Sequence, residues 1–169
     1  ITDSINAAGR MDSAVTALQL VLCEDEDRAA ELAHRLTEIN VSRQETEQEI
    51  VKAAQELLDR EPGLLEDRVI LLWGQNWHPG VIGIVAGRIK EKTGKPSIVI
   101  AVDEAGTGKG SGRSIAGVDL GAAIIAAKDA GFLEAGGGHA MAAGLTVRED
   151  KIEALADWLD ERLAGDVAR

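Results

Sequence analysis

Apolar residues recur at helical spacing through the first third of the chain. Val15, Leu18 and Leu22 fall on one side of a first predicted helix, and a second stripe runs through residues 29–58, which contain neither Gly nor Pro. As one helix this second stretch would be about 45 Å long. Its middle, residues 42–49, is polar on all sides, which is typical of a helix that crosses solvent between two packed bodies. Two shorter helices of one bundle are the alternative.

The pattern changes after Pro62 and Gly63, which end the helical arm. Short apolar, β-branched runs then alternate with helical periods. The predicted strands are residues 69–73, 97–102 and 145–147, and the predicted helices are residues 81–92, 120–129 and 151–163. The sequence therefore predicts an α/β domain from about residue 66 onward, with a small mixed β-sheet flanked by helices and preceded by a long helix.

Three residue types mark the ends of these helices. The acidic run at residues 24–27 precedes the long helix, where exposed N–H groups carry partial positive charge. Asp119 is a predicted N-cap for residues 120–129, and Gly94 a predicted C-cap for residues 81–92.

Charge and cysteine content narrow the function classes. The chain has 29 acidic against 18 basic residues, a formal net charge of −11, so a surface that coats polyanions is excluded and any nucleic-acid site must be local. Cys23 is the single cysteine, which favours a reducing compartment, with the cytoplasm as the default. No apolar run is long enough to span a membrane. The start at Ile1 is typical of a segment cut from a longer protein.

Three glycine-containing segments are candidates for binding: residues 4–10, 108–114 and 136–144. In the second, Ser111, Arg113 and Ser114 place two hydroxyls and a guanidinium within four residues, a combination suited to a phosphate. In the third, three glycines precede His139, and we expect a short helix there whose first N–H groups face an anion. Simple glycine turns remain the alternative for both segments.

Common catalytic motifs are missing. No segment has the P-loop spacing or G-x-G-x-x-G, and GRSIA at residues 112–116 lacks the final glycine of a nucleophile elbow. His34, His78 and His139 belong to no metal-binding motif, so we predict no metal site in this chain. His78 is expected to cap a turn. Trp77 lies between polar residues, where its indole could stack on a base or pack on a neighbouring domain.

The order of four motifs resembles a known family. SINAAGRM, WHPGVIGIVAGRIKEKTGKPSIVIA, KGSGRS and GGGHAMAAG are similar to the C-terminal part of the RecJ single-stranded-DNA exonucleases of the DHH phosphoesterase superfamily. The resemblance covers nearly the whole chain. It implies that residues 1–23 end a DHH catalytic domain, residues 24–62 form a connector helix, and residues 66–165 form a DHH-associated nucleic-acid-binding domain.

The resemblance also implies a function. RecJ-like enzymes degrade single-stranded DNA from 5′ to 3′ with Mn²⁺ or Mg²⁺ in recombination and repair, and their metal ligands lie in DHH-domain motifs absent here. This chain would be catalytically incomplete and would form the opposite wall of the substrate cleft. Its implied site residues are Ser111 and Arg113 at a terminal phosphate, Gly137, Gly138 and His139 at the scissile nucleotide, Trp77 and His78 near the cleft, and Asn6 and Arg10 in the segment that closes the catalytic domain.

Other functions stay open at this point. Small DHH phosphodiesterases that degrade short RNA, cyclic dinucleotides or phosphoadenosine phosphate share the GGGH segment, and the C-terminal domain of alanyl-tRNA synthetase is a related binding module. A non-catalytic interaction domain, in which the glycines are only turns, fits the net charge of −11.

Overall fold

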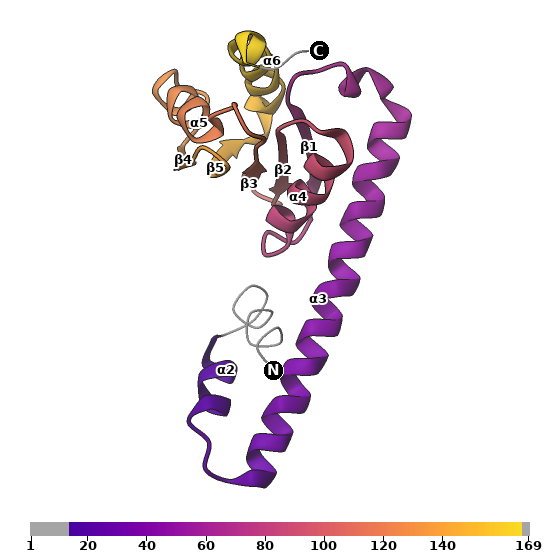
Figure 1. Ribbon diagram of the computed structural model, residues 1–169, viewed down its shortest axis with the longest axis vertical. Coiled ribbons are helices and arrows are strands. Elements are labelled where there is room, and N and C mark those ends of the chain that lie inside the picture. Colours follow the sequence, from indigo (N-terminus) through magenta and orange to yellow (C-terminus); the bar gives the residue numbers. More distant parts are fainter. Residues whose placement is uncertain (1–13, 167–169) are drawn as a thin grey trace. The chain divides into compact units, whose positions relative to one another are not determined.

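The computed structural model describes residues 14–166, and the chain divides into two compact units, Ile1–Glu49 and Ile50–Arg169. The first unit contains helix α2 (Ala14–Val21) and the first part of helix α3 (Glu26–Arg60), coloured indigo to purple in Figure 1. Ala17 and Leu36 are buried in its small apolar core, with Leu20 and Ile39 packed against them.

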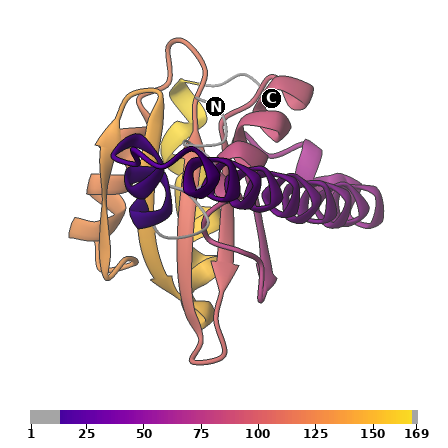
Figure 2. The same cartoon turned by 90° about the horizontal axis from the view of Figure 1, so that it is seen from below.

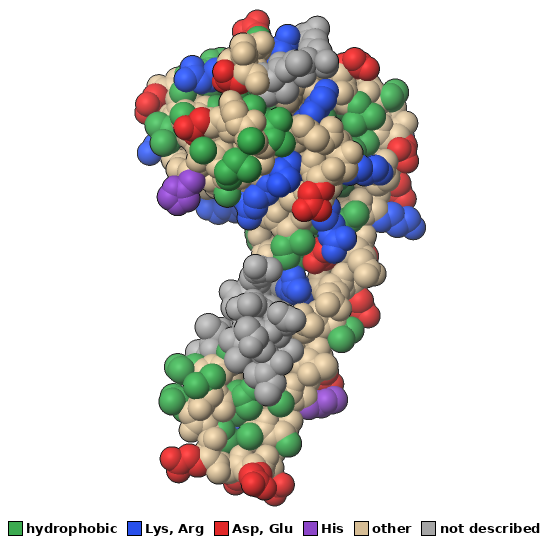
Figure 3. All heavy atoms as spheres, viewed as in Figure 1, with side chains coloured by type: hydrophobic (Ala, Val, Ile, Leu, Met, Phe, Trp, Pro, Cys, Tyr) green, Lys and Arg blue, Asp and Glu red, His purple; other side chains and the backbone are tan. Residues whose placement is uncertain are grey.

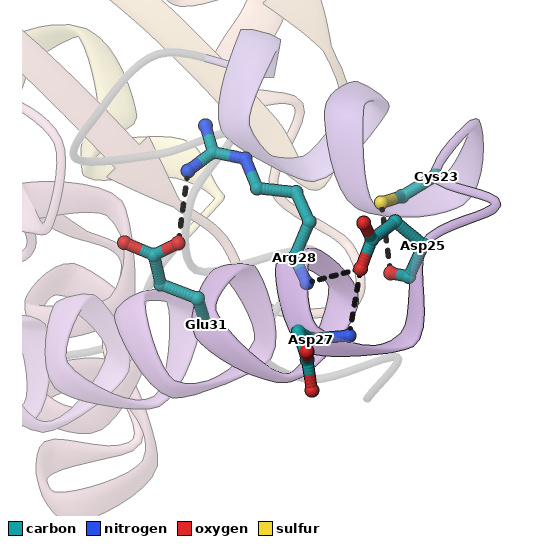
Figure 4. A network of polar contacts seen from close by, with 5 residues as sticks. All are labelled: Cys23, Asp25, Asp27, Arg28 and Glu31. Atoms are coloured by element: carbon teal, nitrogen blue, oxygen red, sulfur yellow. Dashed lines mark hydrogen bonds and ion pairs between the residues drawn. The ribbon is translucent and has the colours of Figure 1, made fainter.

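Helix α3 begins at the predicted acidic run. The Asp25 carboxylate accepts hydrogen bonds from the backbone N–H groups of Asp27 and Arg28, at 2.9 and 3.1 Å, which satisfies two of the free donors at the helix start (Figure 4). The helix then continues for 35 residues, about 52 Å at 1.5 Å per residue. A single long helix is thus confirmed, and the alternative of two shorter helices is wrong.

The middle of α3 differs from the prediction of a fully solvated stretch. The side chains of Arg43 and Glu47 are only 12% and 7% exposed, and their Nη1 and Oε2 atoms lie 3.6 Å apart. One helical turn separates the two residues, so opposite charges can shield each other when both side chains leave solvent. The periodicity of apolar residues could not reveal a buried pair of charged ones.

The second unit is built on a five-stranded mixed sheet with the order β1-β2-β3-β5-β4. β1 and β2 are parallel, and all other neighbours are antiparallel. The strands are β1 (Ile70–Gln75), β2 (Ser97–Val102), β3 (Thr107–Arg113), β4 (Ala135–His139) and β5 (Ala142–Arg148). The helices are α4 (Ile82–Thr93), α5 (Leu120–Asp129) and α6 (Ile152–Arg162), with short 3-10 turns η1 (Pro62–Leu65), η2 (Glu149–Lys151) and η3 (Leu163–Gly165). The predicted fold class is confirmed.

Helices cover both faces of this sheet (Figures 1 and 2). On one face, α5 and α6 bury Ile124 and Leu155 against Ile98 and Ile100 of strand β2. Helix α4 lies on the other face, against β2 and β3. The predicted caps are present, because Asp119 Oδ1 accepts from the Ala122 N–H at 2.9 Å and Gly94 adopts φ 69° at the end of α4.

The glycine-rich segment that sequence reasoning treated as a loop is the central strand β3. Gly108, Gly110 and Gly112 face the core, where added Cβ atoms would lie 2.7, 2.7 and 2.6 Å from side-chain atoms of Ile100, Leu145 and Leu120. None of the three has a positive φ. These three glycines therefore allow large neighbouring side chains to pack closely and do not form a turn. The high glycine content of the segment is why it was predicted as a loop.

The triple glycine is likewise strand β4 and not the lead into a helix. It pairs with β5 through a tight turn at Ala140 and Met141.

Among residues 14–166, no helix is long and apolar enough to cross a membrane.

Candidate nucleic-acid interface

The two predicted phosphate-binding segments lie side by side on one face of the sheet. Because side chains alternate along a strand, Lys109, Ser111 and Arg113 point away from the core that Gly110 and Gly112 face. The strand register aligns two rows across β3, β5 and β4, namely Ser111, Gly144, Gly137 and Arg113, Ala142, His139. At about 4.8 Å per strand, the Arg113 and His139 backbones are about 10 Å apart. We call this surface of β3, β5 and β4 the open face.

Bare backbone forms the middle of the open face. A Cβ added at Gly137 would meet nothing within 4 Å, and one at Gly144 would meet only the Gly110 carbonyl oxygen, at 3.9 Å. Neither glycine is needed for packing or for a positive φ. Glycine at these positions leaves room for a ligand to approach the main chain closely.

Arg113 is held at the border between the open face and α4. Its Nη1 donates to Ser111 Oγ at 3.0 Å and to the Gly112 carbonyl at 2.7 Å. A Cβ at Gly83, in the first turn of α4, would lie 2.6 Å from Arg113 Nη2 and 3.0 Å from Ser111 Oγ. The helix backbone therefore fixes the guanidinium beside the hydroxyl, a fork of donors that matches phosphate geometry.

Further cations lie along the same face. Lys109 Nζ donates to Thr146 Oγ1 at 3.0 Å, and Arg148 Nη1 donates to Thr107 Oγ1 at the same distance. Figure 3 shows Lys and Arg side chains gathered in a short band across the sheet-bearing unit. This local positive strip is the arrangement that the acidic net charge requires if the chain is to bind a polyanion.

His139 ends β4 with an exposed side chain, and its backbone is clamped by α5. A Cβ at Gly121 would lie 2.7 Å from the His139 carbonyl oxygen, so the helix and the strand touch main chain to main chain. The Leu120 N–H donates to the Ala140 carbonyl at 3.0 Å. This bond also occupies a donor at the start of α5. The prediction of a short helix after the triple glycine is wrong, because residues 135–139 and 142–148 form strands β4 and β5, so no helix N-terminus follows the three glycines.

Trp77 and His78 are both half-buried in the turn after β1. The Trp77 indole lies against Gly74, where a Cβ would be 2.1 Å from the ring. His78 Nδ1 accepts a hydrogen bond from the Gly80 N–H at 2.9 Å, which is a turn-capping contact. The indole thus packs on its own unit, with part of the ring left exposed.

Ser114 is the predicted phosphate ligand that the fold places elsewhere. It is 1% exposed, and its Oγ donates to the Val118 carbonyl at 2.7 Å. Its hydroxyl supports the β3–α5 loop, so we leave it out of the site. Gly138, at φ 153°, passes so close to Ala142 that a Cβ would lie 2.4 Å from the carbonyl oxygen, which makes its role conformational. Asn6 and Arg10 lie outside the described residues.

Sequence reasoning missed three residues that shape this face. Because Gly83 and Gly121 have no side chain, Arg113 and the His139 backbone can lie close to helices α4 and α5. Lys109 extends the cationic strip. The alternation Lys109, Ser111, Arg113 would have placed all three on one face had the segment been predicted as a strand.

The described residues do not fit a metal ion. Between residues 14 and 166, no three His, Cys, Asp or Glu side chains come together in a group that could ligate one. His34 pairs with Glu38 on α3 at 3.2 Å, and the other two histidines lie in the positions described above.

Comparison with known proteins identifies the relatives of this chain. The DHHA1 domain model matches residues 66–165. The single-stranded-DNA-specific exonuclease RecJ of Escherichia coli is 38% identical over 94% of this chain and 30% of its own length, and that of Bacillus subtilis is 35% identical over 93% and 20%. The crystal structure of RecJ in complex with Mn²⁺ from Thermus thermophilus superimposes with a TM-score of 0.82 at 35% identity, covering 99% of this chain and 24% of that one.

These matches agree in sequence and in fold. The chain spans about a third or less of the length of the curated relatives that it matches. The long helix, the mixed sheet and the glycine-rich strands all fall within the superimposed region, since it includes nearly the whole chain. The chain therefore belongs to the DHHA1 domain family, in the form that RecJ proteins carry.

Proposed function

We propose that this chain grips single-stranded DNA and its terminal phosphate in a RecJ-like 5′ to 3′ exonuclease of recombination and repair. In this proposal Ser111 and Arg113 hold the phosphate, Gly137 and His139 face the scissile nucleotide, and Gly138 between them shapes the strand. Trp77 and His78 border the strand, and Asn6 and Arg10 adjoin the catalytic domain. Residues 1–23 end that domain, residues 24–62 connect it, and residues 66–165 bind the substrate.

One observation carries the proposal. The strand register brings a fixed guanidinium with its hydroxyl partner and a glycine-bare strand with an exposed imidazole onto the same face. A strand of DNA needs cations for its phosphates and unobstructed backbone for close approach, and this face offers both. The names of the relatives, single-stranded-DNA-specific exonucleases, agree with that substrate class.

The proposal assigns Mn²⁺ or Mg²⁺ to a DHH catalytic domain of the same longer protein, since the described residues form no metal-binding group. Here the present chain positions the strand and supplies no metal ligand. A cytoplasmic location fits a DNA substrate and a single free cysteine. Metal-dependent DNA degradation by the purified chain, retained after removal of contaminating nucleases, would contradict this division of labour.

The direct test is fluorescence anisotropy of a labelled single strand, with and without a 5′-phosphate, across a salt series. We expect the phosphorylated strand to bind more tightly and Arg113→Ala to remove the difference. The variant should also lower the slope of log K against log salt by about 0.7, the value for one lost phosphate contact on a single strand. Lys128→Ala, on the exposed side of α5, is the matched control. Equal binding of both strands by the wild-type chain would reject the phosphate grip.

A further inference from the structure

Strand β1 forms one edge of the sheet and leaves backbone groups without a strand partner. The Ile70 N–H donates to the Pro96 carbonyl and the Asn76 N–H to the Val102 carbonyl, so even-numbered residues of this segment bond toward β2. In a parallel pair, the N–H and C=O groups of the intervening residues then point the other way. Those of Leu71 and Trp73 face the free edge, and within residues 14–166 no strand pairs with it.

A groove follows this edge. Two adjoining hollows of about 440 and 360 Å³ lie along β1 and share Leu64, Leu71 and Ala156 in their walls. The end of α3 and the turn η1 form one side, and α6 forms the other. Trp73 lines the groove and is 36% exposed, although it stands on a strand whose first three residues are buried. An accessible Trp over an apolar floor is the kind of residue that dominates binding interfaces.

The charged residues that line this groove are all acidic, and two cations lie beside it, Arg68 at Asp160 and Lys95 at the Asp67 carbonyl. Six carboxylate residues and no Lys, Arg or His line the two hollows. Asp160 is engaged by Arg68 at 2.8 Å, whereas Glu153, Asp157 and Glu161 are exposed on α6. The remaining acidic residues of the set are Glu61 and Asp67. Such a rim repels nucleic acid and acidic peptides, and it attracts Lys and Arg side chains.

We propose that this groove docks an extended segment of a partner protein in which apolar residues alternate with Lys or Arg. The segment adds a strand to the free edge of β1, its apolar side chains fill the trough beside Trp73, and its basic side chains reach the carboxylates of α6. Main-chain hydrogen bonds then supply affinity, and the alternating side chains supply specificity. A helical occupant would leave the edge N–H and C=O groups of Leu71 and Trp73 unpaired, so the extended form is favoured.

This surface is separate from the open face. It lies on the opposite edge strand of the same sheet, since β1 and β4 are the two ends of the strand order. The open face carries Lys109, Arg113 and Arg148, whereas the charged residues that line the groove are acidic. A basic segment bound at β1 would therefore leave the proposed DNA site accessible.

The test selects random short peptides displayed on phage against the intact 169-residue chain and measures the affinity of the enriched peptides by anisotropy. We expect enrichment of peptides in which Lys or Arg alternates with aliphatic or aromatic residues. The double variant Glu153→Lys/Asp157→Lys should weaken their binding by roughly tenfold or more, about 1.4 kcal/mol per tenfold. The double variant Glu104→Lys/Glu134→Lys changes net charge equally at exposed positions away from the groove and should leave binding within about twofold of wild type.

A second measurement tests the extended form. Methylation of alternate backbone nitrogens on one edge of the best peptide should abolish binding, because those nitrogens can no longer donate to β1. No enrichment above background, acidic consensus peptides, or equal affinity for the charge-reversed chain would overturn the proposal. Tight binding by both of two methylated peptides, one methylated on each edge, would overturn strand addition, because one of the two edges must donate to β1.

Discussion

Gly83 and Arg113 touch through the bare backbone of helix α4. A Cβ at Gly83 would lie 2.6 Å from Arg113 Nη2, whereas one at Gly87, a turn later, would be 4.0 Å from Arg113 Cγ. The first distance forbids a side chain while the guanidinium keeps its place, and the second is an ordinary contact. Alanine at Gly83 would therefore move the guanidinium, whereas alanine at Gly87 would leave it in place. Comparing the two variants distinguishes an effect on the guanidinium from an effect on the helix itself.

Gly83→Ala should weaken binding of 5′-phosphorylated DNA without unfolding the chain. The added methyl displaces the end of a flexible side chain and not backbone, so the cost to folding is small and offset by the higher helix propensity of Ala, up to about 1 kcal/mol. Displacing the guanidinium should lower affinity by about 1.5–3 kcal/mol, the value of a hydrogen bond to a charged group. Gly87→Ala is the control and should keep wild-type affinity. Thermal melting and anisotropy measured on both variants decide the matter, and equal affinities would contradict the role of Gly83.

Gly121→Ala should destabilise the second unit. Its Cβ would lie 2.7 to 2.9 Å from backbone atoms of His139 and Gly138, which cannot rotate away. Forcing a methyl into such a contact costs about 1–3 kcal/mol and shifts the end of β4. Urea unfolding measures the loss. Gly63→Ala, where a Cβ meets nothing within 4 Å, should change stability little, and a similar midpoint for both variants would show that helix and strand do not constrain each other.

Gly137→Val should reduce DNA binding and leave the fold stable, whereas Gly121→Ala should reduce stability. The side chain enters open space and suits a strand, so the melting temperature should stay or rise slightly. The same side chain occupies the middle of the open face, where we expect it to reduce DNA affinity by roughly tenfold, about 1.4 kcal/mol. Ala154→Val, on the exposed side of α6, is the control for added bulk. If Gly137→Val binds DNA as tightly as the wild-type chain, the DNA does not lie on the open face.

The two serines of the β3 segment should respond differently to removal of the hydroxyl. Ser114→Ala leaves the buried Val118 carbonyl without its donor and should cost about 1–2 kcal/mol of folding free energy, with phosphate-dependent binding retained. Ser111→Ala should cost little stability, because its half-buried hydroxyl only accepts from Arg113, and should weaken binding of the phosphorylated strand. Denaturant titration and anisotropy on the same samples test both statements, and a reversal of the two patterns would refute them.

The sequence predicted the elements that are marked by a periodic pattern of apolar residues or by a local capping residue. Helix α5 has the predicted bounds, and Asp119 and Gly94 cap as expected, because local backbone preferences decide such positions. The strand β3 escaped prediction because its glycines make space for Ile100, Leu145 and Leu120, which come from other parts of the chain. Glycine content alone does not distinguish a turn from a strand that is packed against large neighbours.

The site was partly predictable for the same reason. Ser111 and Arg113 are brought together with Gly137 and His139, because alternate residues of paired strands share a face. Ser114 follows the end of β3 and turns inward to the Val118 carbonyl, so the composition of the segment overstated its number of ligands. Gly83 and Gly121 act through contacts with residues far along the chain, which no local pattern contains.

The most direct test of the phosphate grip is a backbone amide NMR titration of the 169-residue chain with a short 5′-phosphorylated single strand. We expect shift changes at Ser111, Arg113, Gly137, His139 and Gly144, all reduced in Arg113→Ala, and unchanged amides at Trp73 and along α6. Changes confined to the β1 edge, or changes at the open face that persist undiminished in Arg113→Ala, would contradict the claim that this face grips the phosphorylated strand.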